Sequence, residues 1–175
     1  MTNRSDSIVL IGPMGAGKTS IGKRVARALN VRFVDTDAVV VREHGAIAEL
    51  FAERGEAHFR SLERVAVRDA LVDGGVVALG GGAVLDEATQ RELSEHRVVF
   101  LTVAPRVVAT RVSGSKRPLL QGDDAAQRWT EIFETRRPIY ETLADVTFDT
   151  SSGPLADIVA EIVAWSRKNE TPEEK

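Results

Sequence analysis

A glycine-rich segment near the N-terminus carries the residues best suited to chemistry. Gly12-Pro13-Met14-Gly15-Ala16-Gly17-Lys18-Thr19 matches the pattern G-x-x-x-x-G-K-[ST]. Glycines allow a backbone path that side chains would block, so successive N–H groups can converge on a β-phosphate. In this pattern Lys18 reaches the β- and γ-phosphates, and the Thr19 hydroxyl can ligate Mg²⁺. The segment predicts a nucleotide site, and the alternative is a glycine-rich turn that arose by chance.

Two carboxylates follow the second expected strand, in Asp35-Thr36-Asp37. Residues two apart in an extended segment point to the same side, and ligands bind at the carboxyl edge of open α/β sheets. One carboxylate could support Mg²⁺ while the other faces an acceptor hydroxyl. Taken alone, the pair is more typical of solvated loop acids or of a helix N-cap.

Three consecutive glycines and several arginines complete the candidate chemistry. Gly80-Gly81-Gly82 follows the third expected strand and is either a strand-to-helix turn or bare backbone whose amides contact a ligand. A single arginine is most often a surface charge. Together the arginines could neutralise phosphate and hold an anionic acceptor, because a guanidinium matches carboxylate or phosphate bidentately. They are Arg60, Arg111, Arg117, Arg136 and Arg137.

Composition predicts that one globular domain positions these residues. The chain has 175 residues, a size typical of a single domain, and its 43% hydrophobic and 28% charged residues exclude a disordered chain. A net charge of −3 and the lack of a long apolar run argue against nucleic-acid and membrane partners. The absence of cysteine excludes a disulfide framework, a thiolate zinc site and a thiol nucleophile. We expect a cytoplasmic protein and a monomer.

Short apolar runs alternate with longer helical stretches, which predicts βαβ units around a parallel sheet. The expected strands are 8–11, 32–35, 76–79, 98–103 and 146–149. A helix should start near Thr19, because Ile21, Val25 and Leu29 recur every four residues. The glycine- and proline-containing segment 113–124 is either a mobile flap or an ordinary surface loop. The polar tail 169–175 should fray.

The nucleotide-binding classes are separated by what the chain lacks. A switch GTPase needs Asp-x-x-Gly and Asn/Thr-Lys-x-Asp motifs, and neither is present. A helicase or transporter ATPase is usually larger and has a carboxylate closing the strand at 76–79, where this chain has glycines. A minimal P-loop domain with a flap is typical of small-molecule phosphotransferases, whose lids exclude water from the γ-phosphate.

The order and spacing of six motifs resemble the shikimate kinase family over about residues 8–165. The motifs are Gly12–Thr19, Asp35-Thr36-Asp37, Gly55-Glu56 with Phe59-Arg60 and Glu63, Gly80-Gly81-Gly82-Ala83-Val84, Arg117-Pro118-Leu119-Leu120, and Arg136 with Tyr140. Gluconate kinases share the phosphate loop but differ around the acceptor. Nucleoside monophosphate kinases usually carry Asp-Gly-Phe-Pro-Arg where this chain has the glycine run.

The resemblance implies an α/β, three-layer P-loop kinase fold of the nucleoside-monophosphate-kinase type. Its five-stranded parallel sheet would have the order 2-3-1-4-5 with helices on both faces, a shikimate-binding subdomain at about 35–63 and a lid at about 112–124. The implied reaction is ATP- and Mg²⁺-dependent phosphorylation of the shikimate 3-hydroxyl, giving 3-phosphoshikimate and ADP on the route to chorismate and the aromatic amino acids. The alternatives are a P-loop kinase of another small hydroxylated acid, such as gluconate, and a catalytically silent nucleotide sensor.

The resemblance also implies roles for individual residues. Lys18, Asp37 and Arg117 would be catalytic. ATP would bind at Gly12, Gly15, Ala16, Gly17, Lys18, Thr19, Ser20, Arg111, Arg117 and Pro154, and Mg²⁺ at Thr19 and, through water, Asp35. Shikimate would bind at Asp37, Phe51, Phe59, Arg60, Glu63, Gly80, Gly81, Gly82 and Arg136, with the two arginines on its carboxylate.

Two departures from the family pattern fall in the expected acceptor subdomain. Val41 stands where the family often has glutamate, and the stretch 45–47 is one residue short.

Overall fold

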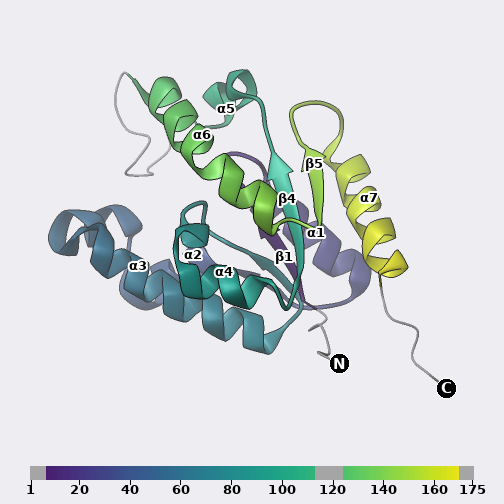
Figure 1. The fold of residues 1–175 in the computed structure, drawn as a ribbon, viewed down its shortest axis with the longest axis horizontal. Coiled ribbons are helices and arrows are strands. Elements are labelled where there is room, and N and C mark those ends of the chain that lie inside the picture. The colour runs from purple at the N-terminus through teal and green to yellow at the C-terminus, as the bar shows by residue number, and fades with distance from the viewer. Residues whose placement is uncertain (1–6, 113–123, 170–175) are drawn as a thin grey trace.

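Five parallel strands form the central sheet, in the order β2-β3-β1-β4-β5 (Figure 1). The computed structural model describes residues 7–112 and 124–169. The strands are β1 (Ile8–Ile11), β2 (Phe33–Asp35), β3 (Val76–Ala78), β4 (Arg97–Thr102) and β5 (Val146–Asp149). The expected strand order and parallel pairing are confirmed. The expected bounds are wrong by one residue at the start of β2, the end of β3 and both ends of β4.

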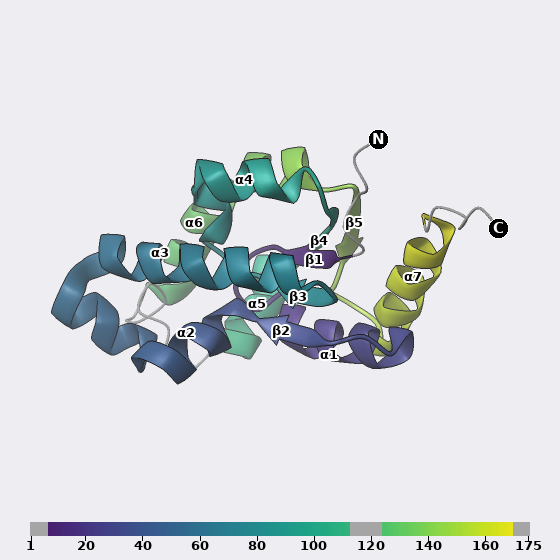
Figure 2. The ribbon, with the colours of Figure 1, turned by 90° about the horizontal axis from the view of Figure 1, so that it is seen from below.

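Helices cover both faces of this sheet. They are α1 (Lys18–Leu29), α2 (Thr36–His44), α3 (Ile47–Asp73), the 3-10 turn η1 (Ala83–Leu85), α4 (Glu87–Leu93), α5 (Pro105–Val112), α6 (Ala125–Leu143) and α7 (Leu155–Lys168). Figure 2 shows α1 on one side of the sheet and α4 with α6 on the other. Because α7 packs against α1, it belongs to the first layer. The implied three-layer architecture is observed.

The apolar pattern explains why these elements form and pack. All four residues of β1 and all three of β3 are buried, as expected for strands covered on both faces. On α1, Ile21 and Val25 are fully buried, so the four-residue spacing marks the face on the sheet. Asn30 caps the C-terminus of that helix in a left-handed conformation with φ of 55°. The chain turns there toward β2.

An arm built from α2 and the first part of α3, residues 36–63, projects beyond the sheet (Figure 1). It packs around a small cluster of Val40, Leu50 and Phe59, completed by Ala66 from the next turn of α3 and separate from the main core. Gly55 interrupts α3 with φ of 80° and ψ of 170°, values that a helix cannot contain. The arm is therefore a locally packed unit, with a break in the helix that carries it.

Two expectations fall outside the described residues: positions 113–123 of the expected lid, with Arg117, and positions 170–175 of the expected frayed tail. Within the ranges 7–112 and 124–169, no helix has both the length and the apolar character that crossing a bilayer requires.

Candidate active site

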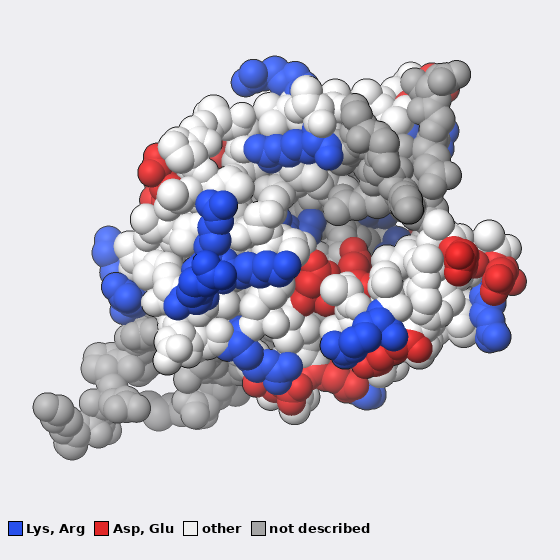
Figure 3. All heavy atoms as spheres, turned by 180° about the vertical axis from the view of Figure 1, so that it is seen from behind, with Lys and Arg blue, Asp and Glu red and all other residues white. Residues whose placement is uncertain are grey.

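A cavity of about 860 Å³ lies at the edge of the sheet where β1, β2 and β3 end. The face seen in Figure 3 is hollowed, with acidic and basic side chains close together in the hollow. Most residues implied by the resemblance line the cavity: Gly15, Gly17, Lys18, Thr19, Ser20, Asp35, Asp37, Phe51, Phe59, Arg60, Glu63, Gly81, Gly82, Arg111 and Arg136. Gly12, Ala16, Gly80 and Pro154 are not among its lining residues.

The phosphate loop has the backbone path that its glycines predict. Gly15 and Gly17 have φ values of 82° and 91°, in the left-handed region that side chains disfavour. Gly12 has φ of 142°, and a Cβ there would overlap the carbonyl oxygen of Leu101 in β4. The loop therefore needs Gly12 for close approach to the sheet, and it needs the other two for its turns.

The lysine of the loop is held by the loop itself. Lys18 Nζ donates hydrogen bonds to the carbonyl oxygens of Gly12 and Pro13, at 2.8 and 2.9 Å. The ammonium group thus lies across the loop, and Lys18 lines the cavity. Ala16 differs, because the residue is fully buried and its carbonyl accepts a hydrogen bond from Thr150.

The first carboxylate of the Asp35-Thr36-Asp37 pair links the loop to α2. Thr19 Oγ1 donates to Asp35 Oδ2 at 2.5 Å, while Asp35 Oδ1 accepts the N–H of Ala38 at 3.1 Å and caps α2. The expectation that the pair lies on an extended segment is wrong, because the cap starts the helix at Thr36 and places Asp37 in its first turn. Both carboxylates nevertheless line the cavity.

The first glycine of the run makes room for two carboxylates. A Cβ on Gly80 would lie 2.5 Å from Asp37 Oδ1 and 2.7 Å from Glu63 Oε1. The N–H of Gly80 is bound by the buried hydroxyl of Thr36 at 3.3 Å. Gly80 therefore lets α2 and α3 bring their acidic side chains together against the end of β3.

The other two glycines of the run lie against two arginines, and Gly82 makes room for one of them. A Cβ on Gly81 would be 3.6 Å from an Nη of Arg136, and a Cβ on Gly82 would overlap the guanidinium of Arg60. The run leads into η1 and so is a strand-to-helix turn as well as bare backbone. Neither of the two interpretations of the run excludes the other.

Burial sets the electrostatics of the acidic side of the cavity. Glu63 is 3% exposed, and its Oε2 accepts a hydrogen bond from Arg60 at 2.8 Å. Its Oε1 has no hydrogen-bond partner among the described residues. Burial raises the pKa of this carboxyl, although the neighbouring Arg60 charge opposes the shift.

Arg60 is held in place by both acidic neighbours on its own helix. Burial acts to lower the pKa of its guanidinium, but the charges and hydrogen bonds of Glu63 and Glu56 outweigh it and raise the pKa. Its guanidinium carbon lies 5.2 Å from the ring centre of Phe59, which in turn packs 5.1 Å from Phe51. The arm thus holds the Arg60 guanidinium over the Phe59 ring.

The nucleotide side is braced by Arg111 of α5. Its guanidinium donates to the carbonyl oxygens of Gly15 and Thr150, each at 2.9 Å. The Thr150 hydroxyl donates to the Ala16 carbonyl at 2.8 Å. These bonds tie the phosphate loop to the segment after β5. Pro154, at the exposed start of α7, contributes no side chain to the cavity.

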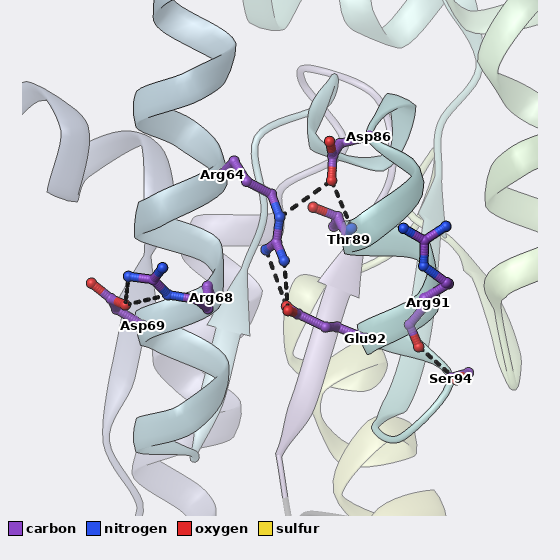
Figure 4. Close-up of polar contacts among 8 residues, drawn as sticks. All are labelled: Arg64, Arg68, Asp69, Asp86, Thr89, Arg91, Glu92 and Ser94. Carbon is purple, nitrogen blue, oxygen red and sulfur yellow. Dashed lines mark hydrogen bonds and ion pairs between the residues drawn. The ribbon is translucent and has the colours of Figure 1, made fainter.

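A cluster of charges fastens α3 to the segment that follows the glycine run (Figure 4). Arg64 donates to both oxygens of Glu92 on α4, at 2.5 and 3.0 Å, and its Nε lies 3.3 Å from Asp86. Asp86 in turn caps α4 by accepting the N–H of Thr89 at 2.7 Å. The helix that carries Arg60 is therefore anchored one turn further along.

The sequence interpretation missed several residues of the cavity wall. They are Met14, Ala38, Val41, Ala46, Ile47, Ala48, Glu49, Ala78 and Leu79. Most are small or apolar side chains with no chemical signature, and their only signal is adjacency to the motifs. Val41, one of the two departures, is therefore part of the wall. Across the ranges that the structure describes, no group of three or more His, Cys, Asp or Glu side chains could hold a metal ion by itself.

Comparisons with known proteins agree with this geometry. The model of the shikimate kinase family matches residues 14–167. A shikimate kinase of Corynebacterium efficiens is 44% identical over 158 residues, 89% of this chain and 94% of that protein. One of Thermobifida fusca is 47% identical over 146 residues, 82% and 84%. The structure of Acinetobacter baumannii shikimate kinase in complex with shikimate has a TM-score of 0.90 at 32% identity and covers 97% of this chain and 96% of that one. The chain belongs to the shikimate kinase family.

Proposed function

We propose that this protein transfers the γ-phosphoryl group of ATP to the 3-hydroxyl of shikimate, giving 3-phosphoshikimate and ADP. The observation that carries the proposal is one cavity with two halves. The phosphate loop and Lys18 line one half, and Arg60, Arg136 and Asp37 line the other. A phosphate cradle beside two guanidinium groups and a carboxylate suits a phosphoryl donor and an acceptor that is a hydroxylated acid.

The acceptor half fits shikimate by charge. Arg60 and Arg136 would hold its carboxylate, and the close approach of Gly81 to Arg136 leaves backbone near the same group. Asp37 would accept a hydrogen bond from the ring hydroxyls and take the proton that the attacking hydroxyl loses as its oxygen bonds to phosphorus. Phe51, Phe59, Glu63, Gly80 and Gly82 would complete or brace this half. The Acinetobacter baumannii relative forms a complex with shikimate, which supports the assignment.

The nucleotide half would bind ATP through backbone and side chains of the loop and of α1. Lys18 would exchange its two carbonyl partners for phosphate oxygens, and Gly12, Gly15, Ala16, Gly17 and Ser20 would add backbone or side-chain contacts. Arg111 and Pro154 would flank adenine. Arg117, which lies outside the described residues, would join Lys18 on the phosphates. Because the residues proposed for both substrates come from one chain, a monomer is sufficient as the working unit.

The site also fits Mg²⁺. The ion prefers hard oxygen ligands, keeps several waters and needs only one or two protein groups beside the phosphates. The Thr19 hydroxyl and the Asp35 carboxylate are such groups, and their 2.5 Å hydrogen bond shows that they share one point beside the loop. Thr19 would bind the ion directly and Asp35 through water. When bound, the ion would neutralise charge on the β- and γ-phosphates.

The arm is proposed as the acceptor subdomain, at about residues 35–63, and residues 112–124 as the lid. Support for the first comes from the separate cluster of the arm and from lining residues that it contributes to the acceptor half, which include Asp37, Phe51, Phe59, Arg60 and Glu63.

An assay that couples ADP release to an observable signal tests the function. Purified protein with ATP, Mg²⁺ and shikimate should release ADP in proportion to a phosphorylated product found by mass spectrometry. Gluconate in place of shikimate should give no more ADP than ATP alone. A silent nucleotide sensor would bind ATP and release no ADP with either acid. A gluconate kinase would reverse the two results.

A further inference from the structure

Helix α6 donates one aromatic hydrogen bond to each half of the cavity. The indole N–H of Trp129 donates to the carbonyl oxygen of Met14 in the phosphate loop, at 2.8 Å. The hydroxyl of Tyr140 donates to the carbonyl oxygen of Gly81 in the glycine run, at 2.5 Å. Both rings are almost fully buried, at 2% and 0% exposure. Their separation of eleven residues is about three helical turns, so they share one side of the helix.

Each of these carbonyls belongs to a peptide unit whose second residue is glycine. The units are Met14–Gly15 and Gly81–Gly82, and glycine is the residue that lets a peptide plane turn over at little steric cost. In a planar trans peptide, the C=O and N–H point in opposite directions. Gly15 and Gly82 line the cavity and neither aromatic ring does. Holding the carbonyls on the helix side therefore directs the two N–H groups to the cavity side.

We propose that Trp129 and Tyr140 are positioning residues that fix these two peptide planes, Trp129 for the nucleotide and Tyr140 for the acceptor. The proposal rests on the function proposed above. Neither residue lines the cavity, so Trp129 acts through the backbone that it holds, and Tyr140 acts through the Gly81 carbonyl and through its hydrogen bond with Arg136. Helix α6 would then set the two half-sites independently, through two bonds at different places along one rigid element.

The rings themselves are fixed by packing. Phe133 lies between them, with its ring centre 5.1 Å from that of Trp129 and 6.5 Å from that of Tyr140. Tyr140 also stacks on Phe100 of β4 at 5.2 Å. Burial raises the pKa of Tyr140 to about 12, against the opposing charge and hydrogen bond of Arg136, so its hydroxyl remains a donor at neutral pH. Because packing fixes the Tyr140 ring, its hydroxyl can donate a hydrogen bond in only one direction.

Two single substitutions make a crossed test. Tyr140→Phe keeps the ring and removes the donor, and should raise the KM for shikimate about three- to tenfold, as loss of one neutral hydrogen bond predicts. Its KM for ATP should stay within about twofold of wild type. Trp129→Phe should do the reverse, raising the KM for ATP and the Kd for ADP, measured by calorimetry, by a similar factor. Replacing Trp129 with the analogue 3-benzothienylalanine keeps the ring shape without an N–H. Its effect on both constants should match that of Trp129→Phe.

Phe133→Leu is the matched control, because it removes aromatic volume from the same side of α6 and removes no donor. It should lower the melting temperature and leave both KM values within about twofold. The proposal is overturned if Tyr140→Phe and Trp129→Phe each raise both KM values, because a general loss of packing would have that effect. It is also overturned if neither variant raises the constant assigned to it. Failure of the proposed function is distinct: wild-type protein would then release no ADP with shikimate, while the calorimetric arm with ADP would still decide the role of Trp129.

Discussion

The arginines of the acceptor half differ in what holds them when no substrate is bound. Arg60 is paired with Glu56 at 3.1 Å and with Glu63 at 2.8 Å, so substrate must compete with two carboxylates on the same helix. Arg136 is 7% exposed, faces the glycine run from α6 and is hydrogen-bonded to Tyr140. A buried guanidinium in a polar cleft is poised for an anion. At the scale of single residues, Arg136 is therefore the sharper probe of the acceptor.

Arg136→Lys should raise the KM for shikimate about ten- to a hundredfold, because lysine keeps the charge but loses the two-point fork, a loss of about 1.5–3 kcal/mol. The KM for ATP should change little. Steady-state kinetics with each substrate varied in turn give both constants. A variant that binds shikimate normally and ATP poorly would reverse the assignment, and the same substitution at Arg60 would show whether one arginine or the whole acceptor half is misassigned.

Lys18→Ala should lower turnover by at least about a hundredfold, since it removes a positive charge placed where charge develops on the transferring group. Circular dichroism and the melting temperature should remain close to wild type, because the bonds of Lys18 to the carbonyls of Gly12 and Pro13 stay within one loop and Lys18 is not part of the hydrophobic core. A folded variant with near wild-type turnover would show that the loop does not bind the transferred phosphate.

The raised pKa of Glu63 predicts a pH dependence of stability. A carboxyl whose pKa is higher in the folded than in the unfolded state stabilises the fold fully below the unfolded pKa, and this stabilisation is lost as the pH rises through the folded pKa. Relative to Glu63→Gln, the wild-type free energy of unfolding should therefore fall as the pH rises above about 4, the ordinary pKa of glutamate. Urea denaturation of both proteins across this range measures the difference. A constant or rising difference would mean that the charge of Arg60, and not burial, determines the pKa of the Glu63 carboxyl.

At the scale of elements, α3 has to hold Arg60 and Glu63 against the glycine run although Gly55 breaks it on the arm side. The anchor on the other side is Arg64, which joins α3 to α4 through Glu92 and Asp86 (Figure 4). Partly exposed ion pairs contribute little to stability. We expect these ion pairs to matter for position and not for stability, because they fix the helix turn that follows the acceptor residues.

Arg64→Met should raise the KM for shikimate about two- to fivefold, the equivalent of about 0.5–1 kcal/mol for a partly exposed ion pair, and leave the KM for ATP unchanged. Arg68→Met is the control, since Arg68 lies on the same helix one turn later and pairs with its exposed neighbour Asp69. It should leave both constants at wild-type values. Equal effects of the two substitutions would mean that lost charge on α3, and not the tie to α4, is responsible.

At the scale of the whole molecule, two apolar cores of unequal size meet at the cavity. The main core is built on β1, β3 and β4, and the arm has its own cluster of four buried residues and a few partly buried ones. Small clusters under projecting elements open at lower free energy than central strands. The acceptor half therefore belongs largely to the less stable unit, and the phosphate loop to the more stable one.

Hydrogen exchange measured by mass spectrometry should show this inequality. Backbone amides of the arm should exchange faster than those of β1 and β4 in the free protein, and shikimate should slow the arm because ligand binding stabilises the state that binds it. ADP alone should mainly protect the phosphate loop and leave the arm nearly unchanged. Protection of the arm by ADP to the same degree would show that the two units open together.

The sequence by itself determined the strands, their order through the family resemblance, and most of the charged residues at the cavity. Apolar runs are local features of the sequence, so the first and last residues of β1 and β5 could be predicted correctly. The spacing of Lys18 and Thr19 is likewise a local property of one loop. Tertiary structure alone decided which side chains meet. Asp35 caps a helix that begins at once, each glycine of Gly80-Gly81-Gly82 faces its own charged side chains, and Trp129 holds Met14 across 115 residues. Contacts between segments distant in the chain leave no periodicity or spacing in the sequence, because they arise only when packing brings those segments together.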